Sequence, residues 1–192
     1  MKMRYLLIAM GTLVGLISLV GSALAVYMLT TNFGGLISHN RFVLDNDNIS
    51  FTLPRVWEPV SSDNVEITLN NFGSPMTMRV YKRSDLDIVM ANDLLELRVR
   101  EELQQFDSHN LVRDLGVTNV NGRRIYSRLY AVEREGVQTQ YFFSVVEFLG
   151  SETYVYVQYE TREVFMKYHI NDIGRLLRRM KWEGEGIDIA MR

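Results

Sequence analysis

The pattern of apolar and polar positions separates an N-terminal apolar run from a longer body of mixed periodicity. Residues from Tyr5 to Leu29 include no charged side chain, and Lys2 and Arg4 precede them. A helix over this run would be roughly 37 Å long at about 1.5 Å per residue, which exceeds the about 30 Å of a bilayer's hydrocarbon core. We therefore predict one N-terminal transmembrane helix within residues 1–30.

The same run has the features of a cleavable signal peptide. Ala23 and Ala25 occupy the small-residue positions that precede a signal-peptidase site, so cleavage would fall after Ala25. Against cleavage, apolar residues continue from Val26 to Leu29. An uncleaved signal-anchor is the leading interpretation, and a protein secreted after cleavage is the alternative.

Basic residues near the apolar run indicate its orientation. Lys2 and Arg4 stand before the run and no basic residue follows it closely, so the N-terminus is predicted to be cytoplasmic and the C-terminal domain extracytoplasmic. A small, polar tether is expected over residues 31–40, a single α+β domain over 41–183 and a tail over 184–192. The cell membrane is thus the predicted location.

Alternation with a period of two predicts strands in the first half of the domain. A short strand is expected over residues 49–53, where Pro54 ends it. Residues 65–69 and 76–82 alternate apolar and polar side chains, as half-buried antiparallel strands do. The turn-forming residues 70–75 connect the two.

The period then changes to that of a helix, predicted to begin at Ser84 with a capping box to Asp87 and to end near Phe106. The charged residues Arg98, Arg100, Glu101 and Glu102 are assigned to its solvated face. The buried positions are expected at Ile88, Leu95, Val99, Leu103 and Phe106.

A meander of strands is predicted from Leu111 to Glu160. Asn121-Gly122 lies between two strand-like runs and is the clearest hairpin signal in the sequence. The run over residues 137–149 is apolar on both of its alternating faces, so this strand is expected at the centre of the sheet with cover on both sides.

A last helix is predicted from Thr161, as its cap, to Lys181 or Trp182. Its buried positions are expected at Phe165, Ile173, Leu176, Leu177 and Met180, and His169 is placed on the polar face. Basic side chains gather at its end, at Arg175, Arg178, Arg179 and Lys181. They interact favourably with the negative end of the helix dipole, or they bind an anionic partner or lipid headgroups.

Composition narrows the class of partner. Removing Lys2 and Arg4 from the 21 Lys and Arg leaves 19, against 23 Asp and Glu, so the domain is net acidic and nucleic acid is not expected as a partner. The chain has no cysteine, which excludes disulfides and thiolate metal sites.

Motifs for catalysis are absent from the sequence. It contains no GxSxG, HExxH or GxxxxGK[ST] pattern, and its three histidines are far apart. We therefore expect no enzyme, no cofactor and no metal. Glu66, Glu147 and Glu160 on predicted strands would be the candidates for a hydrolase with paired carboxylates, which is the third hypothesis.

The predicted order of elements resembles the Mog1/PsbP-like family. The residues that carry the likeness are Phe51, Leu53, Pro54 and Trp57, where an early strand runs into a proline and a nearby tryptophan, and it extends over residues 41–183. The resemblance implies an antiparallel sheet packed between helices. It also implies non-enzymatic attachment to a larger assembly, and the membrane segment favours the bacterial envelope members.

We therefore predict a membrane-anchored extracytoplasmic accessory or assembly subunit of an envelope complex. Its expected partners are the bilayer, through Tyr5 to Leu29, and an envelope or membrane protein, with a homo-oligomer left open. The exposed face of the sheet or the basic helix end would be the contact. The alternative is a secreted small-ligand-binding protein with a pocket at Tyr141 and Phe143.

Overall fold

The computed structural model describes residues 39–46, 48–86, 90–134 and 136–183. The predicted membrane segment, most of the tether and the tail lie outside the described residues. Within the ranges given above, no helix is both long enough and apolar enough to cross a bilayer.

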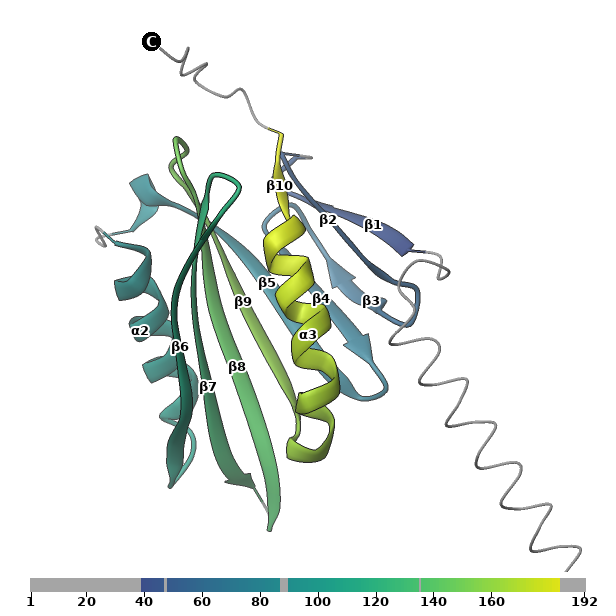
Figure 1. Cartoon of the computed structure of the whole chain (residues 1–192), viewed down its shortest axis with the longest axis vertical. Coiled ribbons are helices and arrows are strands. Elements are labelled where there is room, and N and C mark those ends of the chain that lie inside the picture. The colour runs from purple at the N-terminus through teal and green to yellow at the C-terminus, as the bar shows by residue number, and fades with distance from the viewer. Residues whose placement is uncertain (1–38, 47, 87–89, 135, 184–192) are drawn as a thin grey trace, which may run out of the picture. The chain divides into compact units, whose positions relative to one another are not determined.

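The main sheet has seven antiparallel strands, ordered β3-β4-β5-β9-β8-β7-β6 (Figure 1). The predicted meander is confirmed, because β6, β7, β8 and β9 follow one another in the chain and pair with their neighbours. The strands are β3 (Glu58–Ser62), β4 (Glu66–Asn71), β5 (Ser74–Lys82), β6 (His109–Val120), β7 (Arg123–Arg134), β8 (Val137–Phe148) and β9 (Thr153–Arg162).

A smaller sheet has the strand order β1-β2-β10, with β1 at His39–Leu44, β2 at Ile49–Pro54 and β10 at Lys181–Trp182. Only β2 is predicted from the sequence. Strand β1 includes the last two residues of the expected tether. Strand β10 pairs Lys181 and Trp182 with Ser50 and Ile49, where the sequence predicted the end of the last helix.

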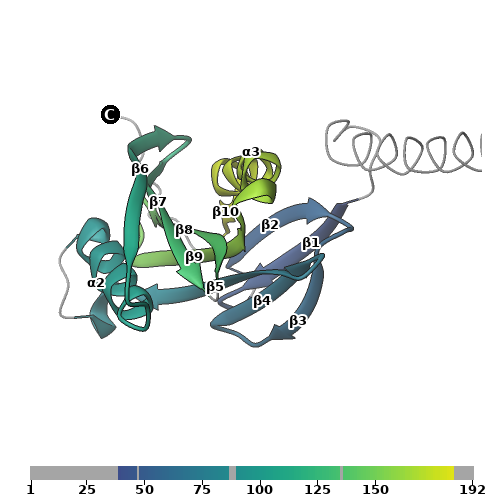
Figure 2. The same cartoon turned by 90° about the horizontal axis from the view of Figure 1, so that it is seen from below.

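Two helices cover opposite faces of the main sheet, α2 (Ala91–Leu103) on one side and α3 (Glu163–Arg179) on the other (Figures 1 and 2). One core lies between the sheet and α2, and a larger one lies between the sheet, α3 and the smaller sheet. Strand β8 contributes Phe143 and Val145 to the first core and Phe142 and Val146 to the second. The predicted central strand, covered on both sides, is therefore confirmed.

Helix α2 begins later than predicted. Ser84 lies in a 3₁₀ turn at Arg83–Asp85, and the residue before α2, Met90, makes no side-chain cap. Asp87 and Ile88 lie outside the described residues. The rest of the predicted stripe is confirmed, because Leu95, Val99 and Leu103 are buried and Phe106 packs against them.

Helix α3 differs from the prediction at both ends. Thr161 belongs to β9, and its hydroxyl lies 2.7 Å from the Ser74 hydroxyl in place of capping the helix. Phe165 is 44% exposed, where a buried position was predicted. The prediction is confirmed at Ile173, Leu176, Leu177 and Met180, all of them buried.

Candidate functional site

The basic end of α3 opens into a cleft of about 520 Å³. Arg178 and Arg179 reach it from the last turn of α3, and Lys181 from β10. Two further basic residues that the sequence analysis did not select also line it, Arg41 of β1 and Arg123 of β7. The smaller sheet, the last helix and the main sheet thus bring five cationic side chains to one cleft.

Arg123 is the buried member of this group, with 8% of its surface exposed. Its guanidinium donates to the carbonyl of Met180 at the end of α3, and its Nε donates to the Asn121 carbonyl at 3.3 Å. Burial lowers the pKa of Arg123, but an arginine remains protonated at any physiological pH. No described carboxylate forms an ion pair with it. The charge of Arg123 is therefore held under the cleft without a described counter-ion.

One acidic residue lines the cleft, and its carboxylate already has partners within the protein. Glu183 pairs with Arg41 at 3.1 Å and accepts a hydrogen bond from the Ser50 hydroxyl at 2.8 Å. Across the ranges that the structure covers, Arg178, Arg179 and Lys181 form no ion pair. The cleft consequently carries excess positive charge, which attracts anions.

Arg175 does not join the cleft. It pairs with Asp172 at 3.3 Å on the same helix and is absent from the cleft lining. Three of the four predicted partner-binding residues therefore come together. A signal for Arg123 was present in the sequence, since alternation places it on the inward face of its strand with Ile125, where a charge is unusual.

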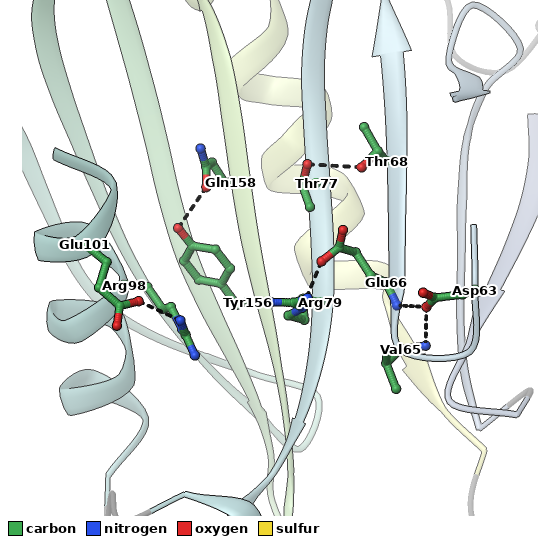
Figure 3. Close-up of polar contacts among 10 residues, drawn as sticks. All are labelled: Asp63, Val65, Glu66, Thr68, Thr77, Arg79, Arg98, Glu101, Tyr156 and Gln158. Carbon is green, nitrogen blue, oxygen red and sulfur yellow. Dashed lines mark hydrogen bonds and ion pairs between the residues drawn. The ribbon is translucent and has the colours of Figure 1, made fainter. Parts of the chain in front are cut away.

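The other predicted contact, the exposed sheet face, carries polar side chains that pair with one another (Figure 3). Arg79 contacts Glu66 at 2.8 Å across β5 and β4, and on the same two strands the hydroxyls of Thr77 and Thr68 lie 3.3 Å apart. Asp63 accepts from two backbone N–H groups, which lower its pKa. This face offers fewer unmatched charges than the cleft does.

At the border of that face, Arg98 of α2 departs from the predicted solvated position. It pairs with Glu101 at 2.6 Å (Figure 3). Its guanidinium also lies 4.8 Å from the centre of the Tyr81 ring. Next to it, burial raises the pKa of Tyr156. Helix α2 thus closes against the sheet through polar as well as apolar contacts.

The three glutamates proposed for paired-carboxylate chemistry lie apart. Strand register places Glu147 opposite Tyr154 and Glu160 opposite Tyr141. At about 3.4 Å per residue and about 4.8 Å between strands, the Cα atoms of any two of the three glutamates are separated by about 16 Å or more. Glu66 pairs with Arg79, and Glu147 lies 3.7 Å from Arg124. In the described part of the chain, no three His, Asp or Glu residues gather in an arrangement that could hold a metal.

His169 was predicted on the polar face of the last helix, and that prediction is wrong. It is 4% exposed and shares a short hydrogen bond between its Nδ1 and the Tyr159 hydroxyl. The fully buried Trp57 packs edge-on against both rings. The tryptophan of the early motif therefore holds a buried polar pair in the larger core.

The aromatic residues expected to line a ligand pocket instead belong to the core under α2. Tyr141 packs against Phe106 with ring centres 5.3 Å apart, and Phe143 stacks on Tyr156 at 6.5 Å. Burial, followed by the nearby Glu160, raises the pKa of Tyr141 to about 12. These side chains therefore contribute to the packing of the core between the sheet and α2.

A helix on each face of a seven-stranded antiparallel sheet, with a short second sheet beside α3, defines an α+β protein of the Mog1/PsbP-like fold. Solved structures support this assignment. The Ran-binding protein Mog1p of Saccharomyces cerevisiae aligns with a TM-score of 0.59 and 7% sequence identity, over 77% of this chain and 96% of that chain. Cyanobacterial PsbP (CyanoP) of Synechocystis aligns with a TM-score of 0.58 and 15% identity, over 77% and 94%.

LpqN of Mycobacterium tuberculosis, described as involved in cell envelope biogenesis, is also similar. It aligns with a TM-score of 0.50 and 11% identity, over 76% of this chain and 91% of that chain. No family model and no curated protein matches the sequence. At these identities the comparisons establish the fold, and the fold resemblance inferred from the sequence is confirmed.

Proposed function

We propose that this protein is a non-enzymatic, membrane-anchored accessory or assembly subunit of a cell-envelope complex. In this proposal the apolar N-terminal segment localises the domain outside the cytoplasm. The basic cleft at the end of α3 binds an acidic surface of a membrane or envelope protein. The envelope role named for LpqN supports this class of function, as does the protein-binding role named for Mog1p.

The observation that carries the proposal is the convergence of charge from three parts of the fold. Interaction with the helix dipole accounts for Arg178 and Arg179 in the last turn of α3. It does not account for Arg41, which comes from the first strand of the smaller sheet. A cleft with surplus cationic groups steers and orients an anionic partner.

Photo-crosslinking from the cleft tests the proposal. The full chain, carrying a crosslinking residue in place of Thr52 at the cleft, is expressed in its native membrane and captured after irradiation. We expect one recurrent membrane or envelope protein whose yield falls about tenfold, as for the loss of about 1.4 kcal/mol, in the double variant Arg179→Gln, Lys181→Gln.

Arg175→Gln is the matched control, because it removes one positive charge from the same helix outside the cleft. It should leave the crosslinked yield unchanged. Absence of any recurrent adduct would overturn the proposal, as would an equal yield from the control and the double variant. Rising salt concentration should lower the crosslinked yield, because the contact that precedes crosslinking is electrostatic.

A further inference from the structure

A second cavity, of about 290 Å³, lies between α3 and the strands β6 and β7. Its floor is apolar and belongs to the larger core, with Ile125, Phe142 and Leu177 each no more than 5% exposed. Leu115 and Ile170 add partly buried apolar surface. We call this cavity the α3 groove.

Polar groups lie around the apolar floor. Arg113 comes from β6 and Arg178 from α3, so cationic side chains reach the α3 groove from two separate elements. Neither arginine forms an ion pair with another described residue. Asn171, Ser127 and Thr118 supply neutral hydrogen-bonding groups. An apolar pocket with a few convergent polar groups is the usual form of a small-molecule site.

Gly174 shapes one wall of the α3 groove. It lies in the interior of α3, where glycine is the least favourable residue after proline. A Cβ atom at this position would stand 3.3 Å from the Arg178 guanidinium. The missing side chain therefore leaves the space in which Arg178 lies back along the helix.

Arg178 also lines the basic cleft, so the two cavities adjoin at this residue. An arginine fork binds an oxyanion in a bidentate manner, and the neighbouring floor accepts an apolar body. We propose that the α3 groove binds a small apolar molecule with one oxyanion head, a carboxylate or a phosphate monoester, with Arg113 and Arg178 on the head. This site goes beyond the proposed protein contact and does not depend on it.

Methyl NMR of the full chain in lipid nanodiscs tests the site with hexanoate and hexyl phosphate as probes. We expect saturable shifts at the methyl groups of Ile125, Ile170 and Leu177, and the two probes distinguish a carboxylate from a phosphate head. Hexanol and hexylammonium have the same apolar body without the anion. They should shift these methyl groups at least about tenfold more weakly.

Arg178→Met and Arg113→Met keep the apolar stems and remove the charges, and each should weaken binding of the preferred probe about tenfold. Arg175→Met is the matched control, and it should bind as the parent chain does. The methyl spectrum of each variant reports whether the fold is intact. The inference is overturned if neither anion shifts the three methyl groups, if hexylammonium binds equally well, or if Arg175→Met weakens binding as much as Arg178→Met.

The cleft variant Arg179→Gln, Lys181→Gln separates this inference from the proposed function. It should lose the crosslinked partner and still bind the preferred probe. Conversely, Arg113→Met should lose probe binding and keep the crosslinked partner, because Arg113 lines the α3 groove and not the cleft.

Discussion

At the scale of the residue, the most consequential difference between prediction and structure is His169. The sequence pattern placed Phe165 among the buried positions of the last helix and His169 on its polar face, but the structure buries His169 and exposes Phe165. A single histidine gives no sequence signal for burial, because its partner Tyr159 lies on a neighbouring strand.

Burial lowers the pKa of His169 below 6.5, the ordinary value for a histidine side chain. The unfolded chain therefore binds a proton at pH values where the folded protein does not, and the free energy of unfolding falls as the pH drops below about 6.5. One such group changes stability by at most about 1.4 kcal/mol per pH unit. We expect His169→Gln to lose less stability than the parent chain between about pH 7.5 and about pH 5.5, measured by urea unfolding. Equal losses would contradict this account.

Gly174 allows a second residue-scale prediction. Alanine is favoured over glycine inside a helix by about 0.5–1 kcal/mol, so Gly174→Ala should raise the free energy of unfolding by up to that amount. The flexible end of Arg178 must move by a few tenths of an ångström to make room for the new methyl group. Urea unfolding measures the gain, and probe binding in the α3 groove should weaken. A more stable variant with undiminished probe binding would mean that the position of Arg178 is unimportant.

A third prediction at the residue scale concerns Phe72 in the turn between β4 and β5. Phe72 has a φ of 49° and is 80% exposed, so a large side chain sits in the left-handed region at the tip of the hairpin. Asparagine adopts this conformation more readily and is favoured in such turns. Phe72→Asn should therefore stabilise the protein by about 0.5–1 kcal/mol, as seen in the urea midpoint. A loss of stability would indicate that the Phe72 ring makes a contact in the folded protein.

At the scale of the element, the sequence predicted the strands that alternate regularly. It did not predict the short strands that form only by pairing with a distant part of the chain. The Asn121-Gly122 hairpin was found because both residues adopt positive φ, which their types favour. Strand β10 was missed, because two residues acquire strand geometry only through pairing with β2, far away in the sequence. The start of α2 was predicted too early, because the capping pattern at Ser84 is only a local signal and the folded chain does not begin the helix there.

Met180 lies where α3 ends and the chain turns into β10, and it is fully buried. Met180→Ala would leave a cavity in the larger core and should cost about 2–5 kcal/mol in urea unfolding. Met90→Ala is the matched control, because Met90 is 60% exposed, and it should change stability by less than about 0.5 kcal/mol. A small effect at Met180 would show that the end of α3 repacks easily and that the cleft is not rigidly built.

At the scale of the whole molecule, the class of fold and part of the site followed from the sequence. The basic residues of one helix turn were visible together, and three of them do line the cleft. The sequence did not show that Arg41 and Arg123 belong to the same site. Each is distant in sequence from the end of α3, and only the folded chain brings them to the cleft. Composition could not reveal this either, because a net acidic domain can concentrate its positive charge at one place.

The N-terminal segment decides whether this domain acts at a membrane or free of it. The anchored and the cleaved forms of the protein differ in mass. An uncleaved anchor retains Lys2 and Arg4, so intact-mass spectrometry of the membrane fraction should find the N-terminus complete. Ala25→Leu should then change the mass only by the substitution, because a bulky residue at that position blocks signal peptidase but has no effect on an anchor. A mature chain beginning at Val26 in the soluble extracytoplasmic fraction, abolished by Ala25→Leu, would replace the anchored subunit with a secreted binding protein. The α3 groove would then be its natural site, since it requires no membrane partner.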